Sequence, residues 1–194
     1  MFYEPKNGHG LPHNPFSAIV APRPIGWIST RDSSGQDNLA PYSFFNAVAY
    51  DPPQLMFAST GVKHSLTNIR ETGVFCVNIV GQAQFAAMSL TSGSYPKEVD
   101  EFERASIAKA ECEEIDCPRV ADAPAALECK MTEIITLAGI ANFMVLGEVI
   151  GVHLRDDCLV DGRFDATIWK PVARMGYQDY ALPETFVTQK RPGE

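Results

Sequence analysis

The chain has 194 residues, of which 45% are hydrophobic and 21% charged, and its formal net charge is −8. This length and composition are those of one globular domain with its own apolar core. The acidic balance argues against a general nucleic-acid-binding protein, which would carry a basic face. No apolar run approaches the roughly 20 residues that a membrane-spanning helix needs, so we expect no membrane insertion.

The five cysteines are odd in number, and their spacing fits neither a disulfide framework nor a structural zinc site. Cys76, Cys129 and Cys158 lie in apolar, strand-like surroundings and are expected to be buried thiols. The first residues show no basic segment followed by an apolar one, so no secretory signal is expected. These features predict a cytoplasmic protein in a reducing compartment.

The first third of the chain is expected to contain short strands joined by turns. Asp32 to Gly35 is a run of turn formers typical of a hairpin connection, and the pair Pro52-Pro53 breaks any helix. Between these breaks the apolar stretches are short and rich in β-branched and aromatic residues, which favours strands. The expected strands are 16–20, 25–30, 39–46 and 54–59.

Helices are expected only in the middle of the chain. Ser65 is a good N-cap and Thr72-Gly73 a good stop, which predicts a helix over 65–71. The segment 74–80 is too β-branched for a helix and is expected to be a strand. The remaining expected elements are a helix over 82–92, a helix over 100–110, a loop over 111–125, long strands over 126–137 and 142–155, and a hairpin over 156–164.

Strands dominate this list, neighbouring strands connect by short turns, and the helices are few. The pattern predicts a β-rich α+β fold, an antiparallel barrel with peripheral helices. We expect an N-terminal arm over 1–14, one domain over 15–182 and a C-terminal tail over 183–194. No Gly-x-Gly-x-x-Gly follows a strand, so a dinucleotide would have to bind without a Rossmann domain of its own.

Two polar segments carry the candidate chemistry. The loop 38–46 sets hydroxyls, an amide and bare backbone beside aromatic rings, a combination that a flat heteroaromatic ligand needs. Lys63-His64-Ser65 places a cation and a hydroxyl at the start of the expected helix, where free N–H groups favour a phosphate. The alternatives are a β-arch whose phenylalanines fill the core and a capped surface helix with a solvated lysine.

The ordered run made of Arg23-Pro24-Ile25, Ser29-Thr30, Gly35, 38–46 and Asp51-Pro52-Pro53 resembles the flavin reductase-like family of FMN-binding split-barrel proteins. The resemblance extends over roughly residues 14–180. It implies an antiparallel split β-barrel of the FMN-binding type. His64 is a departure, since the family usually has an acidic residue after the lysine.

The resemblance also implies where FMN binds. Lys63 and Ser65 would contact the phosphate, Ser59 the phosphate or ribityl chain, and the loop 38–46 the ring. The implied cofactor-binding residues are Thr30, Asn38, Ala40, Pro41, Tyr42, Ser43, Phe44, Asn46, Ser59, Lys63, Ser65 and Arg174. His153 is the implied catalytic residue, near the flavin and the nicotinamide. The alternatives are a half-buried strand histidine for His153 and a surface salt bridge for Arg174.

The implied function is an FMN-dependent oxidoreductase, a flavin reductase that uses NADH or NADPH as a transient electron donor. Hydride would pass to the flavin N5, and the electrons would go on to an acceptor or a partner monooxygenase. The alternatives are a flavoredoxin-like electron carrier without direct NAD(P)H activity and a split-barrel module that has lost its ligand. Family members form homodimers, so a homodimer is expected.

Overall fold

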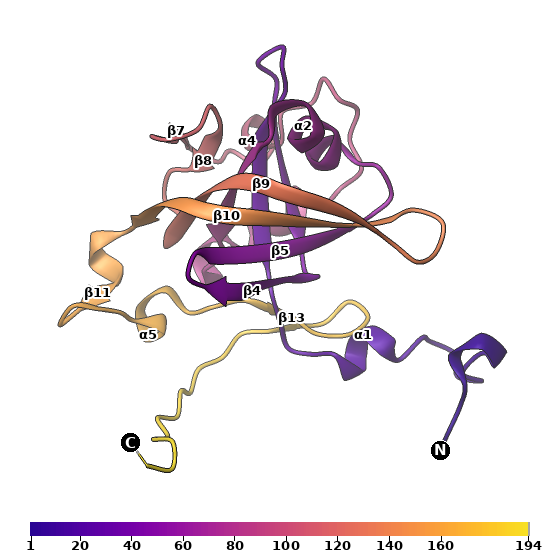
Figure 1. Ribbon diagram of the computed structural model, residues 1–194. Coiled ribbons are helices and arrows are strands. Elements are labelled where there is room, and N and C mark those ends of the chain that lie inside the picture. Colours follow the sequence, from indigo (N-terminus) through magenta and orange to yellow (C-terminus); the bar gives the residue numbers. More distant parts are fainter. Residues whose placement is uncertain (194) are drawn as a thin grey trace.

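The computed structural model describes residues 1–193, and its centre is one curled antiparallel sheet (Figure 1). From one edge to the other, its seven strands are β3 (Asp37–Tyr42), β2 (Gly26–Arg31), β6 (Val74–Ile79), β9 (Ala125–Leu137), β10 (Asn142–Leu154), β5 (Pro53–Thr60) and β4 (Phe45–Tyr50). The long β9–β10 hairpin forms the middle of the sheet and projects beyond it at its turn (Figure 1). The expected β-rich fold with an antiparallel barrel is therefore confirmed.

The helices are short and lie outside the sheet. They are η1 (Pro5–Asn7), α1 (Phe16–Ile19), α2 (His64–Thr72), η2 (Gln82–Gln84), α3 (Phe85–Leu90), α4 (Glu101–Arg104), η3 (Asp156–Cys158) and α5 (Ala166–Trp169). Short strands form three smaller sheets: β7 (Lys109–Glu111) with β8 (Pro118–Val120), β11 (Leu159–Val160) with β12 (Arg163–Phe164), and β1 (Arg23–Pro24) with β13 (Ala173–Arg174) and β14 (Tyr180–Ala181).

Strand register separates the sheet into an inner and an outer face. Ile28, Val77 and Leu127 stand opposite one another on neighbouring strands and belong to the apolar cluster inside the barrel. The next row, Ser29, Cys76 and Glu128, faces outward because successive side chains alternate between faces. The outer face is not left to solvent, since the β7–β8 hairpin packs on it next to β2 and β6.

A second apolar cluster lies on the outer side of β2 and β3. Trp27 and Leu39 pack there against Met88 of α3 and Phe102 of α4. The indole N–H of Trp27 donates to the hydroxyl of Thr91 at 2.9 Å, so this large buried ring leaves no polar atom unpaired. These contacts hold the helices and the connection between them against the edge of the sheet at β3.

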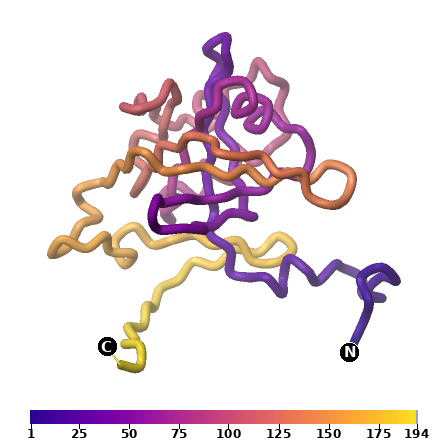
Figure 2. Tube along the Cα trace, viewed as in Figure 1, coloured from indigo at the N-terminus to yellow at the C-terminus, as the bar shows by residue number. Residues whose placement is uncertain are grey.

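The two ends of the domain run together on one side of the barrel, where the N-terminal segment and the C-terminal segment lie next to each other (Figures 1 and 2). Arg23 is buried there and donates to the carbonyl oxygens of Ser17, Val20 and, at 2.7 Å, Met175. Gly176 lies against Ala18 so closely that a Cβ on it would meet the alanine Cβ at 2.3 Å.

The tail after Ala181 contains no helix or strand in residues 182–193, and residue 194, which belongs to the expected tail over 183–194, lies outside the described residues. None of the helices in residues 1–193 is long and apolar enough to cross a membrane.

One strand prediction was wrong, and a second was wrong in part. Residues 16–20 form the helical turn α1, because Val20 N–H donates to the Phe16 carbonyl, and the apolar side chains of this segment lie exposed with no strand to pair with. The predicted strand over 39–46 is two strands, β3 and β4, because the chain leaves one edge of the sheet and joins the other between Tyr42 and Phe45.

The helix predictions were less accurate at their ends. Lys63, not Ser65, is the N-cap of α2. The helix expected over 100–110 is only α4, because Ser106 has a φ of 54° and turns the chain toward β7. The helix over 82–92 is the short η2–α3 pair, and the loop over 111–125 contains β8, which pairs with β7.

Candidate functional site

A pocket of about 240 Å³ opens between strand β3, the start of α2 and the loop that follows α3. Each of these three elements contributes polar side chains or backbone. The residues that line the pocket are Asn38, Ala40, Pro41, Tyr42, Val62, Lys63, His64, Ser65, Thr91, Ser92, Gly93, Ser94, Tyr95 and Glu101.

The start of α2 offers free donors to this pocket. Lys63 is the N-cap in an extended conformation, and no side chain caps the first turn, so backbone N–H groups there have no intrahelical partner. The helix has nine residues, and its dipole adds partial positive charge at this end. Gly61, with a φ of 90°, turns the chain sharply from β5 into the helix, and its carbonyl accepts the Ser59 hydroxyl at 3.0 Å.

Tyr42 brings an unpaired hydroxyl to the same end of the pocket. Its oxygen is buried and has no hydrogen-bond partner among the described residues. Burial raises the pKa of Tyr42, while the hydroxyls of Ser65 and Ser59 beside it act in the opposite direction. The Lys63 ammonium lies 5.8 Å from the centre of the Tyr42 ring. A buried unpaired donor with two hydroxyls and a cation around it fits a phosphate group.

Two amide side chains fasten α2 to the strands beneath it. Asn38 on β3 donates to the Ser65 hydroxyl at 3.0 Å, and Asn68 on α2 donates to the Thr30 hydroxyl at 3.0 Å. Thr30 is fully buried and does not line the pocket, so it supports the site from the layer behind.

Glu101 is a buried carboxyl that lines the pocket, and sequence reasoning missed it. It accepts the backbone N–H of Leu39 at 3.0 Å from the first turn of α4. Burial raises the pKa of Glu101, although the Leu39 N–H and the neighbouring His64 act in the opposite direction. A carboxyl held in this way is placed to hold or release a proton at the pocket wall.

The loop from Thr91 to Tyr95 was also missed. The Tyr95 hydroxyl donates to the Leu90 carbonyl at 2.8 Å, and its ring lies 4.6 Å from the Arg104 guanidinium carbon. Gly93 faces that ring so closely that a Cβ would meet it at 2.6 Å. The only sequence signal was the Ser-Gly-Ser run that follows the helix.

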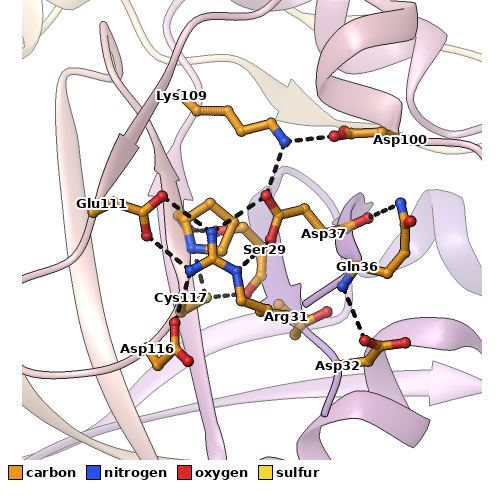
Figure 3. A network of polar contacts seen from close by, with 12 residues as sticks. Ser29, Arg31, Asp32, Gln36, Asp37, Asp100, Lys109, Glu111, Asp116 and Cys117 are labelled. Atoms are coloured by element: carbon orange, nitrogen blue, oxygen red, sulfur yellow. Dashed lines mark hydrogen bonds and ion pairs between the residues drawn. The ribbon is translucent and has the colours of Figure 1, made fainter. Parts of the chain in front are cut away.

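A network of ion pairs joins the residues that precede Asn38 and Glu101 in the sequence (Figure 3). Asp37, the residue before Asn38, accepts Arg31 and Lys109, both at 2.8 Å. Lys109 also pairs with Asp100, the N-cap of α4, at 2.5 Å. These bonds tie the β2–β3 hairpin, the β7 strand and α4 into one unit, and Asn38 and Glu101 follow directly in sequence from Asp37 and Asp100.

The structure does not bring all expected residues to this pocket. Ser43, Phe44 and Asn46 do not line it: the chain turns away after Tyr42, Phe44 lies 42% exposed, and the Asn46 side chain accepts the N–H of Ala47 on β4. Ser59 lies behind the pocket, bonded to Gly61. Arg174 lies on β13, where it donates to the Tyr177 carbonyl and stacks 4.5 Å from the Tyr180 ring.

His153 lies in a different place, on the outer face near the end of β10. Its Nε2 lies 2.5 Å from a carboxylate oxygen of Glu128, which is 1% exposed. The histidine borders a separate hollow of about 480 Å³ together with Arg119 and Arg155. Its catalytic role therefore stays a prediction, without support from the pocket described above.

The comparisons with known proteins agree with this geometry. Residues 19–167 match the model of the flavin reductase like domain, and the chain belongs to this family of flavoproteins. An uncharacterized protein of Deinococcus radiodurans is 37% identical over 172 residues, which cover 82% of this chain and 75% of that protein.

Two solved structures are similar over nearly the whole chain. One is the 2-nitrobenzoate 2-nitroreductase NbaA of Pseudomonas fluorescens, with a TM-score of 0.82 and 32% identity over 92% of this chain and 89% of that one. The other is nitrilotriacetate monooxygenase component B of Bacillus cereus, with a TM-score of 0.84 and 29% identity over 93% and 100%. The fold is the split barrel, as in a further split-barrel structure at a TM-score of 0.84 and 24% identity.

Proposed function

We propose that the protein is an FMN-dependent oxidoreductase that binds the FMN phosphate at the start of α2. The observation that carries this proposal is the buried Tyr42 hydroxyl, which has no partner among the described residues and lies beside the Ser65 and Ser59 hydroxyls. Lys63 and the uncapped first turn of α2 supply the positive charge that a dianionic phosphate needs.

The same pocket offers groups suited to the edge of a flavin ring. Asn38 lines it with a side-chain amide, and Ala40 and Pro41 present backbone with little side chain in the way. Their place on the edge strand β3 leaves part of this backbone without a strand partner on one side, since β3 is the first strand of the sheet. Backbone groups of this kind can bind the donors and acceptors of a pyrimidine ring.

When bound, FMN would supply the redox chemistry by accepting hydride from NADH or NADPH and passing electrons to an acceptor. The contribution of the chain is to hold the phosphate with Lys63, to orient the ring through β3, and to keep a protonatable carboxyl, Glu101, at the pocket wall. His64 adds a second ionisable group beside Lys63, at the position where the family resemblance leads one to expect an acid.

The acceptor belongs to one of two classes. The similarity to a nitroreductase favours a small oxidised substrate, and the similarity to a monooxygenase component favours a partner protein that uses reduced flavin. We propose delivery to an acceptor or a partner monooxygenase in a cytoplasmic setting, without assigning the substrate of either relative to this chain.

We further propose a homodimer. Strand β4 is the last strand of the sheet, and two of its side chains, Val48 at 51% and Tyr50 at 99%, are exposed. An exposed apolar edge strand is a liability in a monomer and is commonly covered by another chain.

The first experiment is a visible absorbance spectrum of the purified protein after addition of FMN and desalting, followed by anaerobic NADH and then NADPH. We expect retained yellow colour that bleaches with one of the nucleotides. Colour that is retained and does not bleach would favour the flavoredoxin-like electron carrier. Loss of colour on desalting, with no turnover in excess FMN, would contradict the proposed function.

A further inference from the structure

Three cysteine side chains meet on the outer face of the barrel, away from the flavin pocket. Cys76 lies on β6 between Ser29 and Glu128 on the neighbouring strands. Cys112 and Cys117 lie at the two ends of the turn of the β7–β8 hairpin that covers this face, and all three belong to one packed cluster. Among the described residues no group of histidine, cysteine or acidic side chains has the arrangement of a metal site.

Cys112 and Cys117 face each other across the hairpin. The register pairs Glu111 with Pro118, so the next residues on the two sides are the two cysteines. The N–H of Cys112 donates to the carbonyl of Cys117 at 3.0 Å. The N–H of Cys117 donates within the turn, to the carbonyl of Ile115, so the two cysteines share one backbone hydrogen bond. Residues opposed across a hairpin have Cα atoms about 4.5–5.5 Å apart, within the span of about 4.4–6.8 Å that a disulfide bridges.

The three thiols differ in their access to solvent. Cys76 and Cys117 are fully buried, whereas Cys112 is partly exposed. An oxidant from solution therefore reaches Cys112 first. The neighbouring thiols of Cys117 and Cys76 lower the pKa of Cys112 to about 5, although its partial burial and the Glu128 carboxylate oppose this. Cys112 is then a thiolate at neutral pH, the form in which cysteine is nucleophilic.

The turn between the two cysteines is held in place by a buried carboxylate. Glu128 accepts the backbone N–H groups of Glu113 and Glu114, each at 2.8 Å, and is bonded to His153 on its other side. Gly151 stands opposite Glu128 on β10, where a Cβ would come within 3.3 Å of the carboxyl carbon. The carboxylate thus keeps the turn between Cys112 and Cys117 closed.

We propose that Cys112 and Cys117 form a dithiol that reacts with peroxide and closes reversibly to a disulfide. In the first step the Cys112 sulfur attacks one peroxide oxygen: an S–O bond forms, the O–O bond breaks, and the departing hydroxide takes a proton to become water. In the second step the Cys117 sulfur attacks the Cys112 sulfur: the S–S bond forms, the S–O bond breaks, and hydroxide leaves with the Cys117 proton as water. Two thiols and one hydrogen peroxide give one disulfide and two waters.

Cys117 is a better partner for Cys112 than Cys76 is. Cys76 is in the middle of a strand that is hydrogen-bonded on both sides, so its backbone cannot adjust. Cys117 directly precedes the short strand β8, and its thiol interacts with the Cys112 thiol and donates to the Ser29 carbonyl at 3.2 Å. The remaining two cysteines are elsewhere: Cys129 points into the barrel and Cys158 lies on η3.

The test uses the whole protein, reduced, freed of reductant and treated with a modest excess of hydrogen peroxide before alkylation. Trypsin cuts after Lys109 and Arg119, so both cysteines fall in one peptide, 110–119. We expect this peptide to lose two hydrogens and to escape alkylation, and dithiothreitol to restore both alkylation sites. Cys112 should react about tenfold or more faster than Cys158, because the lowered pKa of Cys112 gives a thiolate, whereas burial raises the pKa of Cys158 and leaves a much weaker nucleophile.

Three variants test the role of each cysteine. In Cys117→Ser, Cys112 should stop at the sulfenic acid and be trapped by dimedone, and in Cys112→Ser the peptide should stay fully reduced. Cys158→Ser is the matched control and should still form the disulfide. Free thiols at both positions after peroxide treatment, or a disulfide that joins Cys112 to the Cys76 peptide or to a second chain, would overturn the proposal.

Discussion

The side-chain amide of Asn38 donates to the hydroxyl of Ser65 at 3.0 Å and joins the edge strand β3 to the first turn of α2. The two residues are 27 positions apart in the sequence, and both line the pocket. Because this bond uses the Ser65 hydroxyl as an acceptor, the hydroxyl proton remains free to donate to a ligand. The bond therefore positions a phosphate donor as well as stabilising the fold.

Replacement of the cation at the start of α2 should weaken FMN binding without disturbing the fold. We expect Lys63→Ala to raise the Kd for FMN by about ten- to a hundredfold, since a charge-assisted contact contributes about 1.5–3 kcal/mol. The measurement is fluorescence quenching of FMN on titration with protein. Lys130→Ala, which removes an exposed lysine on β9, is the control and should bind FMN as the wild type does. Equal affinity in the two variants would contradict the phosphate role of Lys63.

The unpaired hydroxyl of Tyr42 should matter for binding and not for stability. This buried oxygen has no partner at hydrogen-bond distance among the described residues, and only the Ser65 and Ser59 hydroxyls lie beside it, so Tyr42→Phe should change the free energy of unfolding by no more than about 1 kcal/mol. The FMN affinity should fall about tenfold, because the donor then has no replacement. Denaturant unfolding and FMN titration of the same sample measure both. A variant that loses stability but keeps its affinity would show that the hydroxyl serves the fold.

The long strands could be predicted because the strand preference of their own sequence agrees with the fold. Val74 to Val80 is a continuous apolar, β-branched run, and the two segments of the β9–β10 hairpin are long, free of proline and separated by the turn at Ala138-Gly139. Each forms a strand within a residue or two of the expected limits. Residues 16–20 have similar apolar content but no strand to pair with, so tertiary context decided against the local preference.

The candidate site was predictable only where one short segment carries the chemistry. Lys63 and Ser65 stand at a helix start and were expected together. Glu101 was not, because it reaches the pocket only through the packing of α4 against β3, which brings it to Leu39, 62 positions away in sequence. Ser43 and Phe44 were expected in the pocket but lie outside it, because the chain leaves β3 after Tyr42 and enters β4 at Phe45. A continuous run of polar and aromatic residues gives no sign of this break between two strands.

Acid should weaken the β2–β3 hairpin through Asp32. The ion pair with Lys97 at 2.8 Å, followed by the Ser34 hydroxyl and the Gln36 N–H, lowers the pKa of Asp32 well below its ordinary value of 3.8. A lowered pKa in the folded state means that the carboxylate stabilises the fold above about pH 4 and that this contribution is lost as the pH falls through the folded-state pKa.

Asp32→Asn should therefore be less stable than the wild type at pH 7, and the difference should shrink steadily as the pH is lowered from 5 toward 2. Thermal unfolding across this range measures it. Glu184→Gln, an exposed carboxylate in the C-terminal segment, is the control and should show no such convergence. A stability difference for Asp32→Asn that is constant with pH would mean that the aspartate acts through turn geometry and not through its charge.

Loss of the buried charge at Glu128 should loosen the turn between Cys112 and Cys117. Burial raises the pKa of Glu128, but the N–H groups of Glu113 and Glu114 and the His153 ring outweigh it, so the net shift is downward and the side chain is ionised. In Glu128→Gln one of the three groups that contact the carboxylate, the Glu113 N–H, the Glu114 N–H or the His153 ring, would face the NH₂ of the new amide instead of an oxygen. We expect a loss of about 2 kcal/mol in stability.

The readout that separates this local effect from general destabilisation is hydrogen exchange at the amides of Glu113 and Glu114. These two amides should exchange about tenfold or more faster in Glu128→Gln. The exchange rates of amides in the β9–β10 ladder should change only as much as the free energy of global unfolding changes. Glu133→Gln, an exposed substitution on the same strand, should leave both sets unchanged. If the turn amides stayed protected in Glu128→Gln, the hairpin would be held by the Arg31 ion pairs with Glu111 and Asp116, at 2.9 and 2.7 Å, and not by the buried carboxylate.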